Sequence, residues 1–155
     1  MSRLAFLSPH EADVAGVSPL RHVPGAAFTD VSQLGKLEVR GGDVDLPAAI
    51  PLGPGRALLV LEGDVLSERD RLVQAGYRVY DMTAALAALE VEGEDLMRRL
   101  TELDLDALPA IGSIARGTTA LIERRDGERF RLFVPQELGQ FVAEVVNDMA
   151  RGLGR

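Results

Sequence analysis

A short pattern occurs twice in this chain of 155 residues, and it limits the folds that the chain can adopt. Residues 30–32 read Asp-Val-Ser and lead into residues 37–43, Leu-Glu-Val-Arg-Gly-Gly-Asp. Residues 81–83 read Asp-Met-Thr and lead into residues 89–95, Leu-Glu-Val-Glu-Gly-Glu-Asp, after a spacer that is one residue longer. A repeat of this length indicates a supersecondary unit that is used twice.

Length and composition indicate one domain or two small, closely packed halves. Hydrophobic residues make up 46% of the sequence, which is typical of a globular protein that needs no disulfide or metal to hold its core. The chain has no cysteine, which excludes disulfides, thiolate zinc sites and cysteine nucleophiles. The formal net charge of −7 disfavours nucleic acids as partners, because phosphate contacts need clustered lysine and arginine.

The sequence gives no sign of secretion or membrane insertion. The N-terminal residues lack the apolar stretch of a signal peptide, and the longest aliphatic run, residues 57–61, is far too short to cross a bilayer. We expect a soluble cytoplasmic protein without a membrane partner.

Periodicity predicts an α+β fold after an extended N-terminal arm. Residues 1–28 contain three prolines and no sustained period, and residues 29–155 form the predicted domain, with halves at 29–80 and 81–155. Strands are predicted over residues 36–40, 56–62, 77–80, 89–92, 113–124 and 130–134. Residues 41–56 are predicted as a loop, and residues 84–88 fit either a strand or a helical turn.

Three helices complete the predicted fold, and each is recognised by an apolar stripe. The first begins at Asp64 or Ser67, the second follows Gly93, and the third starts near Pro135 and ends at Gly152. The stripes are Leu66, Leu72 and Val73; Leu96, Leu100 and Leu103; and Leu138, Phe141, Val142, Val145, Val146 and Met149. The element order predicts two small repeated units of ferredoxin-like character, with mainly antiparallel sheet and helices on one face.

Several carboxylates could carry chemistry, although each also has a structural interpretation. Glu38 and Glu90 occupy the same place in the two repeats and could act as an acid–base pair, or could be solvated residues on strand faces. Asp81 and Asp104 could act near a ligand, but a helix cap or turn is the favoured role. Ser113 lacks the sharp turn that a nucleophilic serine needs.

Histidine and glycine patterns are equally unspecific. His10, Glu11 and Asp13, together with His22, could bind a metal, but their spacing matches no known signature. Residues 53–56, Gly-Pro-Gly-Arg, lack the Gly-Lys-Ser/Thr of a phosphate loop. Gly41, Gly42 and Gly93 are predicted to supply turns with positive φ. No residue is therefore predicted as catalytic or metal-binding, and none is assigned to a cofactor.

Arginine dominates the basic residues, and Lys36 is the only lysine. The arginines of the second half are predicted to lie on helix or hairpin surfaces, where they are solvated or pair with an acidic partner. They are Arg98, Arg99, Arg124, Arg125, Arg129 and Arg131. Tyr77 and Tyr80 should lie on opposite faces of their strand, because their positions differ by three, an odd number.

The repeats also carry a family resemblance. Residues 30–41 resemble the opening motif of the folate-binding aminomethyltransferase domains, the group of the glycine-cleavage T protein. Residues 89–105, with Leu-Thr-Glu-Leu-Asp-Leu at their end, resemble the gamma subunit of heterotetrameric sarcosine oxidase. Strands near residues 118–122 and 130–135 and a terminal helix follow in the same order as in that family. The resemblance extends over residues 30–149.

This resemblance implies a non-catalytic small subunit that docks on and stabilises a flavin- and folate-dependent amine-oxidising complex. Flavin and tetrahydrofolate would then be held by larger partner subunits and not by this chain, which could self-associate when isolated. The alternative is a stand-alone folate-binding module with one-carbon transfer activity. The chain lacks the later barrel domain of a complete aminomethyltransferase and the reactive cysteine of the tRNA-modifying folate proteins.

Overall fold

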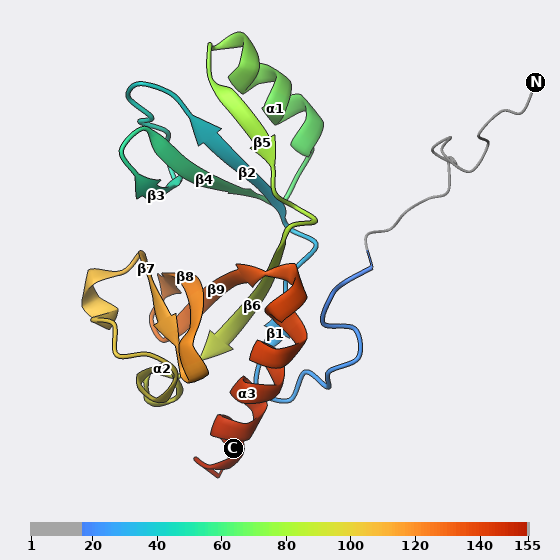
Figure 1. Cartoon of the computed structure of the whole chain (residues 1–155), viewed down its shortest axis with the longest axis vertical. Helices are drawn as coiled ribbons and strands as arrows, with labels where there is room; N and C mark the ends of the chain where they lie inside the picture. Colours follow the sequence, from blue (N-terminus) through green and yellow to red (C-terminus); the bar gives the residue numbers. More distant parts are fainter. Residues whose placement is uncertain (1–16, 155) are drawn as a thin grey trace, which may run out of the picture.

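The chain forms two antiparallel sheets that meet at a narrow waist (Figure 1). The structure is a computed structural model that describes residues 17–154, without the side chain of Arg116. The first sheet has the strand order β3-β4-β2-β5, and the second has the order β1-β6-β9-β8-β7. All named strand pairs are antiparallel, so the predicted α+β class is confirmed.

The elements have the following bounds. The first sheet contains β2 (Gly35–Arg40), β3 (Ile50–Gly53), β4 (Arg56–Leu61) and β5 (Arg78–Asp81). The second contains β1 (Thr29–Asp30), β6 (Leu86–Glu92), β7 (Ala110–Ile114), β8 (Thr118–Asp126) and β9 (Arg129–Pro135). The helices are α1 (Val65–Gln74), α2 (Glu94–Leu100) and α3 (Gly139–Arg151), and short 3-10 turns occupy Leu105–Ala107, Ala115–Gly117 and Gln136–Leu138.

Helices cover the outer face of each sheet. α1 lies over the first sheet, whereas α2 and α3 lie over the second (Figure 1). Beneath α1, a small core contains Leu37, Val39, Leu59 and Leu72. The larger core beneath α2 and α3 alternates along β6 and β9, because every second residue of a strand points to the same face. A third apolar cluster joins the inner faces, the faces that the two sheets turn toward each other.

Helix α1 begins where the sequence predicts but buries less than expected. Asp64, not Ser67, is the N-cap, and its carboxylate accepts hydrogen bonds from the N–H groups of Leu66 and Ser67. The predicted stripe is wrong at two positions, because Leu66 and Val73 are 66% and 51% exposed. One helix lying on a narrow four-stranded sheet has room to bury only Leu72 completely.

We call each sheet with its covering helices a lobe, and the helices of the second lobe differ from prediction at their ends. α2 buries Met97 in addition to Leu96 and Leu100, but it stops before Leu103 because Thr101 has an extended backbone. α3 buries Val142, Val145 and Val146, whereas Leu138 and Phe141 remain 37% and 36% exposed. Pro135 ends β9 instead of opening the helix, which starts only at Gly139.

Two strand predictions were wrong, both at sheet edges. The predicted loop over residues 41–56 contains the edge strand β3. The predicted single strand over residues 113–124 is two strands, β7 and β8, because Ala115–Gly117 forms a turn with Gly117 at φ 81°. The open choice at residues 84–88 is resolved as a turn followed by β6 from Leu86.

The described part of the N-terminal segment packs on the second lobe. Leu20 and Phe28 are buried in its core. Asn147 on α3 accepts a hydrogen bond from the N–H of Ala27 at 3.1 Å and donates one to the carbonyl oxygen of Pro24 at 2.8 Å. Residues 1–16 of the predicted arm lie outside the described residues. No helix among residues 17–154 is long and apolar enough to cross a membrane.

Candidate functional site at the waist

The two repeats cross at the waist and exchange strands. β1, which leads the first repeat, pairs with β6 of the second repeat, where Asp30 stands opposite Leu89. β5 ends at Asp81, the first residue of the second copy of the pattern, and it pairs with β2 of the first copy, where Asp81 stands opposite Leu37. Each sheet is therefore completed by a strand from the other repeat.

The shared Asp-x-Ser/Thr sequence forms the same turn at both crossings. A side-chain oxygen of Asp30 accepts a hydrogen bond from the N–H of Ser32 at 3.0 Å, and Asp81 does the same for Thr83 at 2.9 Å. The turn role predicted for Asp81 is thus confirmed. Asp104 caps a 3-10 turn and accepts a hydrogen bond from the N–H of Asp106, so its structural role is also confirmed.

Lys36 is fully buried at the waist. Its Nζ donates hydrogen bonds to the carbonyl oxygens of Ser32 at 2.7 Å, Leu34 at 2.8 Å and Thr83 at 3.2 Å. Burial lowers the pKa of Lys36 to about 8, although the nearby carboxylates of Asp81 and Asp30 act in the opposite direction. The single lysine therefore joins backbone from both crossings.

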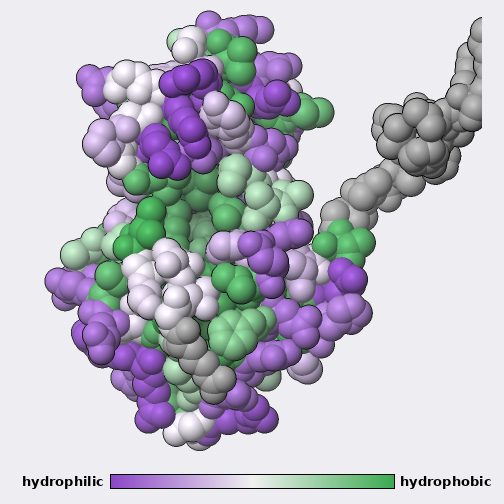
Figure 2. All heavy atoms as spheres, in the orientation of Figure 1, coloured by the Kyte–Doolittle hydropathy of each residue, from purple (hydrophilic) through white to green (hydrophobic). Residues whose placement is uncertain are grey.

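An apolar cleft separates the inner faces of the two sheets. Leu58, Leu121 and Phe133, which are all buried, form its floor. The cleft has a volume of about 240 Å³. Its walls include Leu52, Leu86 and Ile111, and the last of these is 51% exposed. Figure 2 shows hydrophobic atoms gathered in a hollow at the waist. The cleft is large enough for one or two apolar side chains.

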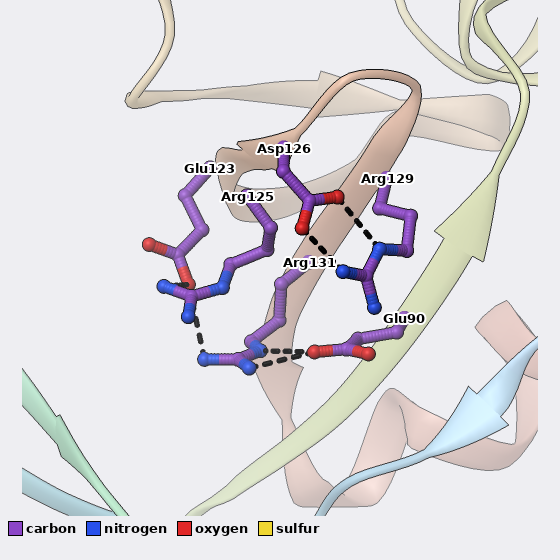
Figure 3. Close-up of polar contacts among 6 residues, drawn as sticks. All are labelled: Glu90, Glu123, Arg125, Asp126, Arg129 and Arg131. Atoms are coloured by element: carbon purple, nitrogen blue, oxygen red, sulfur yellow. Dashed lines mark hydrogen bonds and ion pairs between the residues drawn. The ribbon is translucent and has the colours of Figure 1, made fainter.

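A network of charges occupies the inner face of the second sheet (Figure 3). Arg131 on β9 is 4% exposed and donates to Glu90 on β6 at 2.6 and 3.0 Å and to Glu123 on β8 at 3.2 Å. Burial raises the pKa of Glu123 in spite of the neighbouring charges of Arg125 and Arg131. Arg131 was predicted at the surface, and this prediction was wrong because its side chain lies buried between Glu90 and Glu123 of the two neighbouring strands.

The corresponding place in the first sheet has a different set of residues. Glu38 is 6% exposed, and its Oε1 accepts hydrogen bonds from Arg40 at 2.7 Å and Arg56 at 2.9 Å. Burial alone would raise the pKa of Glu38, but these two arginines outweigh it and lower the pKa. Neither Glu38 nor Glu90 is a freely solvated strand residue, and the structure does not bring them together as an acid–base pair, because each is held by arginines of its own sheet.

Most other arginines of the second half are neutralised within the chain. Arg98 pairs with Glu94, and Arg129 pairs with Asp126 across the β8–β9 turn. Arg124 lies over the ring of Phe130 at 4.8 Å and also reaches Glu94. The predicted opposite orientations of the two tyrosines are confirmed, because Tyr77 packs in the core beneath α1 and Tyr80 lies beside Arg40 on the inner face.

The glycines serve the backbone. Gly93 has the predicted positive φ of 105° before α2. The prediction was wrong for Gly41 and Gly42, and Gly41 instead lies close to the ring of Tyr77, where a Cβ atom would be 2.9 Å from it. Residues 53–56 form the turn between β3 and β4, and the guanidinium of Arg56 forms an ion pair with Glu38.

The histidine and serine candidates do not form a site in the described structure. His10, Glu11 and Asp13 lie outside the described residues. His22 lies in the segment before β1, and no group of three potential metal ligands occurs within residues 17–154. The hydroxyl of Ser113 donates to the carbonyl oxygen of Ile114 at 3.3 Å.

Comparison with known proteins supports the fold. No family model matches the sequence, and no curated protein sequence matches it. The structure is similar to a chain of heterotetrameric sarcosine oxidase from Corynebacterium sp. U-96, which was solved in complex with pyrrole 2-carboxylate. The TM-score is 0.71, the identity is 17%, and the match covers 87% of this chain and 95% of that chain. The expected resemblance to sarcosine oxidase is thus confirmed in structure, and the matched chain is of similar length.

Proposed function

We propose that this chain is a small, non-catalytic subunit that docks on and stabilises an amine-oxidising complex of the sarcosine oxidase type. The observation that carries the proposal is the structural likeness over 95% of a small chain that belongs to a heterotetrameric oxidase. In this proposal, larger partner subunits hold the flavin and the tetrahydrofolate, and the assembly is cytoplasmic.

The use of the polar residues supports a structural role. Glu38, Glu90 and Arg131 are engaged in ion pairs within the chain, and Lys36 is held by three carbonyl oxygens. Exposed apolar residues are scattered over several elements, as on most protein surfaces, so they do not by themselves indicate a docking surface. They are Val17, Leu66, Val73, Tyr80, Ile111, Leu138 and Phe141.

Co-purification tests the proposal. The full chain, tagged at its C-terminus, is recovered from cells of its native source, and the eluate is analysed by mass spectrometry and by its flavin absorbance spectrum. We expect a yellow eluate that contains two or three larger chains. A colourless eluate that contains this chain alone would contradict the proposal.

A second measurement addresses the alternative function. Titration of the isolated chain with tetrahydrofolate in a calorimeter should give no heat if folate belongs to the partners. Saturable heat together with a colourless eluate would favour the stand-alone folate-binding module.

A further inference from the structure

Three arginines stand side by side across the first sheet. In the strand register, Arg40 on β2 is opposite both Arg56 on β4 and Arg78 on β5. Residues directly opposite each other point to the same face, and hydrogen bonds from Arg40 and Arg56 to Glu38 identify this as the inner face. The side chains of Arg40 and Arg56 are 39% and 48% exposed, and Arg78 is exposed as well. We call these three residues the arginine row.

The arginine row is not neutralised by the described part of the chain. Glu38 is the carboxylate shared by Arg40 and Arg56. Arg78 forms no ion pair with any residue in the range 17–154. Three guanidinium groups and one carboxylate leave a local charge of +2, in a chain whose formal net charge is −7. Like charges directly opposite each other destabilise a sheet, so the row is costly to fold without an anion.

The second lobe provides an internal comparison. The repeat aligns Arg40 with Glu92 and, on the neighbouring strand, Arg56 with Arg129. Asp126 stands opposite Arg129 on β8, the strand that corresponds to β3. There the charges alternate in sign, and Arg129 binds Asp126. The fold therefore accepts opposite charges at the positions of Arg40 and Arg56, and it does not itself require two arginines there.

The arginine row adjoins apolar surface. Tyr80 is 45% exposed and lies 4.7 Å beneath the guanidinium of Arg40. Glu38, which binds two members of the row, also lines the apolar cleft at the waist. A ligand for this surface would combine negative charge with an apolar side chain.

We propose that the arginine row is the docking site for an acidic segment of a partner subunit, with an apolar side chain of the same segment in the neighbouring cleft. Carboxylates of that segment complete the charge balance that Glu38 begins, and Arg78 is free to bind one of them. This inference rests on the docking role proposed above, and it names the surface and the chemistry of the partner.

The test uses the full chain with two matched charge reversals. Arg78→Glu changes the row, while Arg69→Glu makes the same change on α1, at an exposed position of the same lobe that forms no ion pair within the described chain. Both variants should fold, because neither side chain has an internal partner to lose, and thermal unfolding checks this. Each variant is tested for recovery of partner chains and, as an isolated chain, for binding of a fluorescein-labelled peptide of one leucine followed by four glutamates.

We expect Arg78→Glu to weaken peptide binding at least about fivefold and to reduce recovery of partner chains, with both effects fading as salt is raised. Arg69→Glu should behave as the wild type. Ile111→Glu, at the mouth of the cleft, should also weaken binding of the peptide.

Two results would overturn the inference. One is equal weakening by Arg78→Glu and Arg69→Glu, because that would be a general effect of net charge. The other is recovery of partner chains by Arg78→Glu at wild-type level and with wild-type salt dependence. If the wild type recovers no partner yet binds the peptide through Arg78, the proposed function fails while the anion-binding surface stands.

Discussion

Ser32 and Ala88 exchange two hydrogen bonds across the waist, although 56 residues separate them in the chain. The Ser32 hydroxyl accepts a hydrogen bond from the N–H of Ala88 at 3.1 Å and donates one to the carbonyl oxygen of Ala88 at 3.4 Å. Thr83 occupies the corresponding place in the second repeat and accepts a hydrogen bond from the N–H of Lys36 at 3.1 Å. The hydroxyl shared by both repeats thus fastens each copy to the sheet of the other.

Replacement of Ser32 by Ala should therefore destabilise the fold. The N–H of Ala88 would remain buried without its partner, which costs about 1–3 kcal/mol. Urea denaturation measures the loss. Ser67→Ala is the matched control, because that hydroxyl binds Asp64 in an exposed position and its removal should change stability by less than about 0.5 kcal/mol. Equal losses in the two variants would contradict the role assigned to Ser32.

The buried amine of Lys36 should give stability a distinct dependence on pH. Its pKa is about 8 in the folded chain and 10.5 in the unfolded chain, so between these values the unfolded chain binds more protons. The free energy of unfolding should rise as pH increases from 8 to 10.5, by an amount on the order of 3 kcal/mol. Below pH 8 the lysine is charged in both states, and the cost of its burial is constant.

Denaturant titrations of the wild type and of Lys36→Met across this pH range test the prediction. The difference in free energy of unfolding between the wild type and Lys36→Met should rise with pH over this range, because all other titrating groups are common to both proteins. A difference that does not change between pH 8 and pH 10.5 would show that the amine titrates normally.

The two lobes suggest a direct test of the Arg131 ion pairs. Glu38 and Glu90 are equivalent in the two repeats, so the residues opposite them are equivalent as well. Arg131 and Glu123 of the second sheet therefore correspond to Leu58 and Ile50 of the first. Arg131→Leu alone should cost about 3 kcal/mol, because it leaves half-buried Glu90 without its counter-ion and buried Glu123 with Arg125 alone. The double variant Arg131→Leu with Glu123→Ile copies the first sheet and should recover more than half of that loss. Chemical denaturation gives both values, and a double variant no more stable than the single one would contradict the comparison.

Gly55 should not tolerate a side chain, whereas nearby Gly42 should. Gly55 has φ 65°, and a Cβ atom there would lie 2.4 Å from the carbonyl oxygen of Gly41. Gly55→Ala should therefore lower stability by more than about 1 kcal/mol. Gly42 has no atom within 4 Å of its added Cβ, and Gly42→Ala should be neutral or stabilising by up to about 1 kcal/mol. Thermal unfolding of the two variants measures the difference, and a Gly42→Ala variant less stable than Gly55→Ala would contradict the turn geometry.

The sequence predicts the elements that have strong local signals. β4 is a continuous apolar run, β9 alternates cleanly, and Asp64 provides an N-cap ahead of α1. β3 and β7 were missed because they are short edge strands. Pro51 and Gly53 in β3 and Gly112 in β7 remove the alternation that marks a strand in sequence.

The candidate site depends on contacts that no local pattern contains. The sequence pattern indicates solvated residues at Glu38 and Arg131, whereas the structure buries both beside ion-pair partners from neighbouring strands. The arginine row exists only in the strand register, because Arg40, Arg56 and Arg78 are far apart in sequence. The repeat itself could have indicated that two equivalent positions would face each other at the waist, but it could not indicate which strands are exchanged.

Because the two repeats exchange strands, the smallest part of this chain with two complete sheets contains both repeats. A single copy of the repeat carries a leading strand that fits the sheet of another copy, and it leaves the edge of its own sheet open. Cutting the gene between the repeats would produce two fragments that complete each other and remain unfinished apart. The same geometry describes how two separate identical chains, each with one repeat, would assemble as a strand-exchanged dimer, the arrangement from which a fused chain of this form can arise by duplication.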